Sequence, residues 1–212
     1  MRCSSRLRLA GPAVTIAVIV GLAGCAGAVE PEGAGRDAAP APSAAPSIPT
    51  PPPAPAPAAP APPPIGVAVP AIGLEAPLID LGIEADGTME VPVDFDDVGW
   101  FTGGGRPGGG RPGGSGPTVI AAHVDSPTGP AAFIDLDELV VGDAVAVTGG
   151  DGTVHDSVVT RVEQYAKNAF PTAEVFGASA RDELRLITCT GVFDPGASSY
   201  VDNLVVYAER VG

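Results

Sequence analysis

Two side chains in the C-terminal part of the chain have the types needed for nucleophilic catalysis. Cys189 ends the apolar run 184–189, and His123 closes a second apolar run, 118–122. A side chain at the end of a strand is held rigidly and still faces solvent. An imidazolium beside a thiol favours the thiolate and donates a proton to a leaving amine. The pair therefore indicates a cysteine nucleophile assisted by a histidine.

Each of these residues also has a structural interpretation. Cysteine is often a small buried hydrophobe, and His123 can be a hydrogen-bonded structural histidine. The second histidine of this region, His155, lies in a polar stretch and is expected on the surface. One cysteine and two separated histidines lack the spacing of metal ligands, so we expect neither a metal nor a cofactor.

The N-terminus has the layout of an export signal. Arg2, Arg6 and Arg8 precede residues 9–29, which carry no charge, and this order is typical of a secretory signal. The run contains Leu-Ala-Gly-Cys at 22–25, which resembles the bacterial lipobox. The resemblance implies a signal peptide over residues 1–24 and a lipid on Cys25. An uncleaved transmembrane anchor is the alternative, and both place the rest of the chain outside the cytoplasm.

Residues 25–65 are expected to form a disordered stalk. Within 31–64, 14 of the 34 residues are Pro and 11 are Ala. Such a segment cannot bury a core and favours the polyproline II conformation. At about 3.1 Å per residue it would reach on the order of 100 Å. The net charge of −14 argues against a nucleic-acid partner, because phosphates need a basic surface.

The remaining residues, 66–212, read as a mainly β domain. Turn signals separate short β-branched runs, and glycine-rich residues 103–116 are expected to form a mobile surface loop without chemistry of its own. About eight short strands suggest a closed barrel or a sandwich. The expected strands are 66–74, 76–83, 89–93, 118–123, 144–148, 154–165, 184–189 and 204–208, with short helices near 131–139 and 171–177.

Three ordered motifs resemble the sortase family, and most closely its actinobacterial class F. They are His-Val-Asp-Ser at 123–126, Leu-Ile-Thr-Cys-Thr-Gly-Val-Phe-Asp at 186–194, and Tyr-Val-Asp-Asn-Leu-Val-Val-Tyr-Ala at 200–208. Trp-Phe at 100–101 and Phe-Pro-Thr at 170–172 fit the same pattern. The resemblance covers residues 66–211 and implies a closed β-barrel of about eight strands with short helices.

The resemblance also implies an activity. It predicts a cysteine transpeptidase that cleaves an LPXTG-like sorting signal of exported proteins between Thr and Gly. Cys189 would form the acyl-thioester, and His123 would donate and accept the proton. An amine of the cell wall, such as a peptidoglycan precursor, or water would release the product. The protein would work outside the cytoplasm, anchored to the cell membrane of a Gram-positive-type bacterium.

One position departs from the family pattern. Class F members often carry an arginine directly after the tyrosine of the last motif, and here that residue is Val201. Asn203 shares the strand parity of position 201, so its amide is a candidate donor to the oxyanion. Arg185 has the parity of Cys189 but lies about 13 Å along the strand. The departure leaves open a second function, a catalytically impaired lipoprotein that binds sorting signals or wall peptides.

Overall fold

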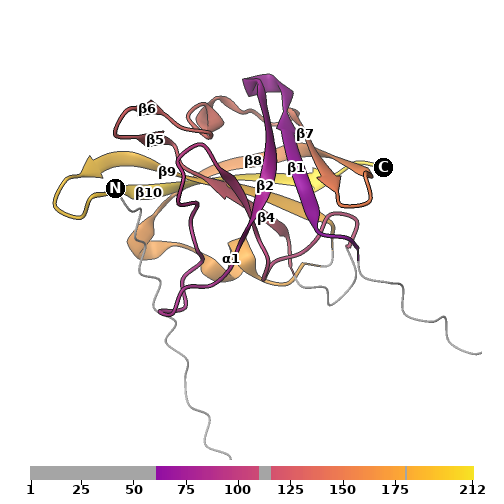
Figure 1. Cartoon of the computed structure of the whole chain (residues 1–212), viewed down its shortest axis with the longest axis horizontal. Coiled ribbons are helices and arrows are strands. Elements are labelled where there is room, and N and C mark those ends of the chain that lie inside the picture. The colour runs from indigo at the N-terminus through magenta and orange to yellow at the C-terminus, as the bar shows by residue number, and fades with distance from the viewer. Residues whose placement is uncertain (1–60, 110–115, 180) are drawn as a thin grey trace, which may run out of the picture. The chain divides into compact units, whose positions relative to one another are not determined.

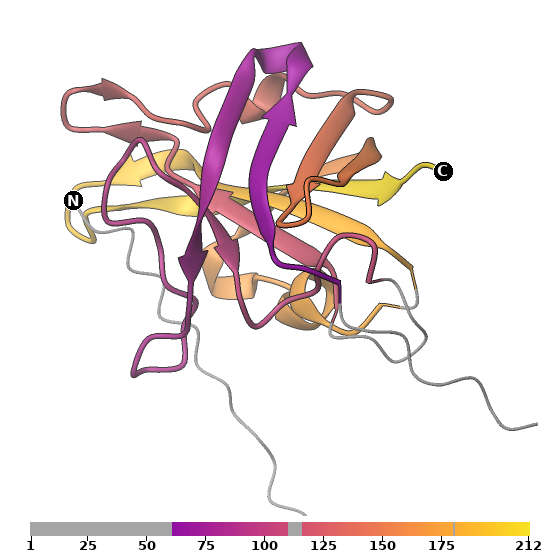
Figure 2. The same cartoon turned by 45° about the vertical axis from the view of Figure 1, so that its right-hand side comes forward.

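Eight strands follow one another around a closed barrel in the computed structural model, which describes residues 61–109, 116–179 and 181–212. The expected signal peptide (1–24) and most of the expected stalk (25–65) lie outside these residues. The barrel has the order β1-β2-β3-β4-β9-β10-β8-β7 and closes where β7 pairs with β1 (Figures 1 and 2). The predicted mainly β fold, a closed barrel of about eight strands with short helices, is confirmed.

The eight barrel strands differ greatly in length, and the three longest are consecutive neighbours in the sheet. The strands are β1 (Pro64–Val69), β2 (Leu74–Leu81), β3 (Val98–Phe101), β4 (Thr118–Ala122), β7 (Ala144–Gly149), β8 (Val154–Ala166), β9 (Glu183–Asp194) and β10 (Ser199–Arg210). The short elements are β5 (Asp125–Ser126), β6 (Gly129–Pro130), η1 (Pro70–Ile72), η2 (Leu136–Glu138), η3 (Lys167–Ala169) and α1 (Thr172–Phe176).

The first hairpin turns earlier than the sequence pattern predicted. The expected break was at Glu75, but Glu75 lies within β2 and pairs with Ala68. The turn is η1 (Pro70–Ile72), and Gly73, with φ +64°, is its C-cap. Proline fixes the first helical φ and glycine adopts the left-handed conformation that ends the turn. The predicted strand 89–93 is reduced to a single bridge between Ile83 and Met89.

The glycine-rich segment connects β3 to β4, and its described residues are anchored. Trp100 Nε1 donates a hydrogen bond to Gly105 O at 3.1 Å, and Gly105 N donates to Pro117 O at 2.8 Å. A Cβ on Gly105 would lie 2.1 Å from Gly116 O, so only glycine fits there. The described residues of this segment therefore form a surface connection that is held by hydrogen bonds and packed closely at Gly105.

The sheet buries side chains on both of its faces. The larger cluster fills the barrel and draws on seven of its strands, with Phe133 and Leu136 from the β6–β7 connection. The smaller cluster lies on the other face of β4, β9 and β10, where α1 contributes Val175. Because β4 is covered on both faces, all five of its residues are buried, which explains its unbroken apolar pattern.

No helix within the described parts of the chain is long and apolar enough to cross a membrane.

Candidate active site

His123 directly follows β4, and Cys189 lies within β9, the parallel neighbour of β4. The expectation that Cys189 ends its strand is wrong, because β9 continues to Asp194. The register of β4 and β9 runs from Thr118 opposite Leu184 to Ala121 opposite Ile187. Continued by two residues, it places His123 opposite Cys189. The strands stay together at this level, because Thr188 Oγ1 donates a hydrogen bond of 2.9 Å to Ala122 O. Residues opposite each other in a sheet point to the same face, and adjacent strands lie about 4.8 Å apart.

Asn203 lies on the next strand at the same level. It is the direct partner of Cys189 in the antiparallel β9–β10 pair, so its side chain shares the face of Cys189. Val201 lies where the register shifts between Tyr200 and Asp202, and 43% of its surface is exposed. The three residues singled out from the sequence, His123, Cys189 and Asn203, therefore meet on one face of three consecutive strands.

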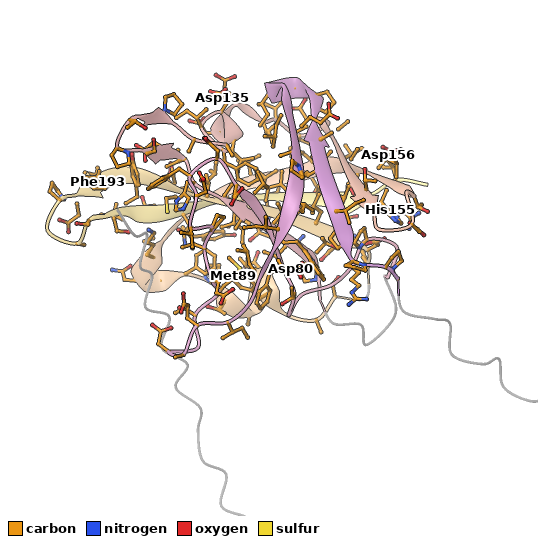
Figure 3. All side chains as sticks on the ribbon, in the orientation of Figure 1. Asp80, Met89, Asp135, His155, Asp156 and Phe193 are labelled. Atoms are coloured by element: carbon orange, nitrogen blue, oxygen red, sulfur yellow. The ribbon has the colours of Figure 1, made fainter. Side chains whose placement is uncertain are left out.

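A cleft of about 200 Å³ opens in front of His123 and Cys189. Its walls come from the loop before β3, from the chain after β4, and from the β9–β10 hairpin. Phe193 on that hairpin is labelled in Figure 3. The described residues that line the cleft are Phe95, His123, Val124, Asp125, Ser126, Pro127, Cys189, Phe193, Ser198, Ser199 and Tyr200.

The imidazole of His123 is fixed by the loop that precedes β3. Its Nε2 lies 2.8 Å from Pro92 O, and its ring centroid lies 4.7 Å from that of Phe95. A carbonyl oxygen only accepts hydrogen bonds, so Nε2 carries the proton in this contact. In the neutral ring, Nδ1 is then the nitrogen that can take a proton. No local sequence pattern predicts this contact, because Pro92 is 31 residues away.

Lys167 reaches the sulfur of Cys189 from just after the end of β8, and the sequence gives no local sign of this contact. Its Nζ donates a hydrogen bond to Cys189 Sγ at 3.5 Å and another to Ser199 Oγ at 2.8 Å. Burial lowers the pKa of Lys167, and the charge of Asp202 opposes this effect. The available signal was compositional, because Lys167 is the only lysine of the chain.

Tyr200 and Asp125 join the two sides of the cleft. The Tyr200 hydroxyl donates a short hydrogen bond to Asp125 Oδ2, and the Tyr200 ring meets Phe193 edge-on with centroids 5.3 Å apart. The hydrogen bond to the carboxylate, and then burial, raise the pKa of Tyr200. Both residues belong to motifs noted in the sequence, but their contact joins positions 75 residues apart.

The arginines of the described residues make their contacts away from the cleft. Arg185 donates to Glu183 Oε2 at 2.8 Å and lies over the ring of Tyr207, so it does not serve as the substitute weighed for position 201. The other four pair with acidic side chains or an aromatic ring: Arg106 with Trp100, Arg161 with Glu174, Arg181 with Glu209, and Arg210 with Asp182.

His155 is buried, and its predicted place on the surface is wrong. Only 8% of it is exposed, because Gly108 and Gly149 of two glycine-rich connections pack against its ring. It pairs with Val147 near the β7–β8 hairpin, where Figure 3 labels it on the side of the view opposite Phe193. Neither ring nitrogen has a hydrogen-bond partner among the described residues. Within those residues, no group of three or more potential ligands is placed to hold a metal.

Comparison with known proteins agrees with this architecture. Residues 67–211 match the family model described as the sortase domain, which is more than half of the chain. No curated protein matches the chain.

Solved structures share the fold. Sortase C from Streptococcus pneumoniae is 27% identical, with a TM-score of 0.53, and the match covers 70% of this chain and 66% of that one. Sortase A from Corynebacterium diphtheriae is 22% identical, with a TM-score of 0.54 and coverage of 71% and 62%. Sortase C-1 from Actinomyces oris is 24% identical, with a TM-score of 0.52 and coverage of 69% and 73%. The chain thus spans just under two thirds of the first two proteins.

Proposed function

The chain belongs to the sortase family, and from that premise we propose that it is a cysteine transpeptidase acting on LPXTG-like sorting signals of exported proteins. The observation that carries the proposal is the β4–β9 register, which brings His123 to the level of Cys189 at the wall of one cleft. A nucleophile and a proton carrier at one cleft are the minimum for acyl transfer. Assignment of the chain to actinobacterial class F within the family is part of this proposal.

The first half of the reaction forms the thioester. Cys189 loses its proton to His123, and the thiolate attacks the carbonyl carbon of the Thr–Gly bond. A C–S bond forms, and the carbonyl electron pair moves to oxygen. The oxyanion then collapses and breaks the C–N bond, and the leaving amine takes the proton from the His123 imidazolium. The N-terminal part of the substrate remains on Cys189 as a thioester.

The second half transfers the acyl group. An amine of a peptidoglycan precursor, or water, gives a proton to His123 as it attacks the thioester carbonyl. The C–S bond breaks, an amide or an acid forms, and the thiolate recovers its proton. The two acceptors differ only in the incoming group, so a purely hydrolytic peptidase is the same chemistry with another acceptor.

Sortases are extracytoplasmic, membrane-associated enzymes, and the N-terminal sequence supports the same location here. We propose that a lipid on Cys25 anchors the chain and that the Pro/Ala-rich residues carry the barrel away from the membrane. This places the cleft where exported sorting signals and wall precursors meet.

One observation favours a second function. Val201 stands where the family resemblance implies an arginine, and loss of one oxyanion donor typically lowers the rate about 10²–10³-fold. A chain slowed to that extent would act as a lipoprotein that binds sorting signals or wall peptides without turning them over.

The experiment that tests the proposal is mass spectrometry of the full-length protein with an LPXTG-type peptide. We expect an adduct of the N-terminal peptide fragment on Cys189, located by peptide mapping, and its transfer to an added glycine-based amine. Cys189→Ala is the matched control and should carry no adduct. Peptide binding without an adduct in either protein would favour the binding function, and absence of both binding and adduct would overturn the proposal.

A further inference from the structure

We propose that Lys167 is a third catalytic residue, whose ammonium stabilises first the thiolate of Cys189 and then the oxyanion of its acyl group; this inference rests on the transpeptidase function proposed above. It supplies the cationic donor that Val201 cannot supply.

The ammonium of Lys167 contacts one side-chain atom from each of two residues that line the cleft. Nζ donates to Cys189 Sγ at 3.5 Å and to Ser199 Oγ at 2.8 Å, and both residues line the cleft. Three strands set this position. Lys167 directly follows the last β8–β10 pair, Ala166 with Asp202, and the next β10 residue is the partner of Cys189.

No other cation competes for this place in the described part of the chain. Lys167 is not itself among the described residues that line the cleft, but it contacts two of them. No arginine is among those residues either, and the five described arginines contact residues outside the lining. The lining has one acidic side chain, Asp125, whose carboxylate accepts the hydroxyl hydrogen of Tyr200. The carboxylate of Asp202 accepts from Gln164 Nε2 at 2.6 Å and favours the charged form of Lys167.

The ammonium has a role in each anionic state of the reaction. A cation beside a thiol stabilises the thiolate and lowers the thiol pKa. After the attack, negative charge moves from Sγ to the carbonyl oxygen, which is separated from Sγ by two covalent bonds. An N–H of the same ammonium that donated to sulfur can then donate to that oxygen. Lys167 stays protonated throughout, so the proton transfers remain with His123.

Partial burial makes this charge more effective. Burial lowers the pKa of Lys167 because water has been removed from around the ammonium. The same loss of water strengthens its attraction to an anion at short range. The hydroxyl of Ser199 satisfies one of the three ammonium donors and fixes its direction.

The first test measures thiol ionisation and needs no substrate. Iodoacetamide alkylation of the reduced full-length protein is followed from pH 5 to pH 10, and modification of Cys189 is read by peptide mapping. Lys167→Met should raise the pH midpoint of alkylation by about 1–3 units, the size expected when a neighbouring opposite charge is lost. Lys167→Arg should keep most of the wild-type midpoint, because it retains the charge.

The matched control removes one positive charge elsewhere. Arg181→Met deletes an exposed cation that pairs with Glu209 and changes the net charge by the same amount. Its midpoint should equal the wild-type value. Ser199→Ala is a second variant for the same measurement, since it removes one hydrogen-bond acceptor of the ammonium without deleting the charge and should raise the midpoint by a smaller amount.

The second test measures acyl transfer. Lys167→Met should lower kcat/KM for an LPXTG-type peptide by about 10²–10³-fold, with Lys167→Arg retaining more activity than Lys167→Met. An unchanged midpoint and unchanged kcat/KM in folded Lys167→Met would overturn the role of Lys167 and leave the transpeptidase proposal standing. A shifted midpoint, with no turnover by any variant including the wild type, would support the coupling of Lys167 to the thiol and count against the transpeptidase function.

Discussion

Asn203 lies directly opposite Cys189 across the β9–β10 pair, so the two side chains share one face of the sheet. Two residues along β10, Val201 lies at a register shift and is substantially exposed. The β9–β10 register thus places Asn203 beside Cys189, while the register shift changes the surroundings of position 201. We propose that the donors available to an oxyanion here are the neutral amide of Asn203 and the ammonium of Lys167.

Asn203→Ala should lower kcat/KM by about 10-fold, the value of one neutral hydrogen bond. Asn203→Asp should be more damaging, because a carboxylate beside Cys189 opposes both the thiolate and the oxyanion. The measurement is peptide cleavage together with the alkylation midpoint of Cys189. Val201→Ala, at an exposed position, serves as the control and should behave as the wild type. Equal rates for Asn203→Ala and the wild type would remove Asn203 from the site.

Val201→Arg should have a larger effect when Lys167 is absent. An arginine at this position adds a charge-assisted donor, but in the wild type Lys167 already supplies one. We expect kcat/KM of the Val201→Arg, Lys167→Met double variant to recover by about 10-fold or more over Lys167→Met alone. If Val201→Arg raised kcat/KM by the same factor in the wild type and in Lys167→Met, the side chains at positions 201 and 167 would not be stabilising the same negative charge.

His123→Ala should reduce transpeptidation by about 10²–10⁴-fold, since it removes the proton carrier. It should also raise the alkylation midpoint of Cys189, because an imidazolium favours the thiolate. Phe95→Leu is a useful comparison, because it alters the packing of the ring without removing either nitrogen. Full activity in His123→Ala would exclude His123 as the proton carrier.

Alkaline pH should destabilise the barrel through Tyr207. Burial, and then the hydrogen bond with Tyr165 at 2.9 Å, raise the pKa of Tyr207 above its ordinary value. Above about pH 10 the unfolded phenol loses a proton that the folded protein keeps. The unfolded state then binds fewer protons than the folded state. The contribution of Tyr207 to the free energy of unfolding is therefore fully present below that pH and is lost as the pH rises further.

The melting temperature measured from pH 8 to pH 11 checks this prediction. Tyr207→Phe keeps the ring under Arg161 and Arg185 but has no proton to lose, so its melting temperature should fall less steeply. Lys167 acts in the opposite direction, because its lowered pKa makes stability rise with pH up to the ordinary lysine value. That contribution is the same in both proteins and cancels in their comparison. Identical slopes would contradict the prediction.

Cys25 should be the first residue of the mature protein and should carry a lipid. The resemblance of residues 22–25 to a lipobox, after a charged and then apolar stretch, is the reason. Intact-mass analysis of membrane-extracted protein should show the loss of residues 1–24 and the added mass of the lipid. Cys25→Ser should abolish that lipid. A mature chain that retains Met1 would instead support an uncleaved anchor.

The sequence by itself predicted most of the strands and the two side chains that we propose to react. The apolar runs before His123 and Cys189 are local patterns that predict strand residues, but the expected strand list lacked β3, and β9 continues past Cys189 to Asp194. The mainly β class and the closed barrel followed from the number of such runs and from the ordered motifs. The first turn was misplaced because the apolar run continues through η1, and only Gly73 at positive φ marks its end.

The tertiary structure decided what surrounds those two side chains. Lys167 contacts Cys189 across 22 residues, and Pro92 contacts His123 across 31. Neither contact has a local signature, because each depends on which strands become neighbours and in which register. The order β4-β9-β10-β8 brings the residues that follow β4 and β8 to the level of residues within β9 and β10. The pairing of these strands places Lys167 beside Cys189, and the loop before β3 supplies the hydrogen-bond partner of His123.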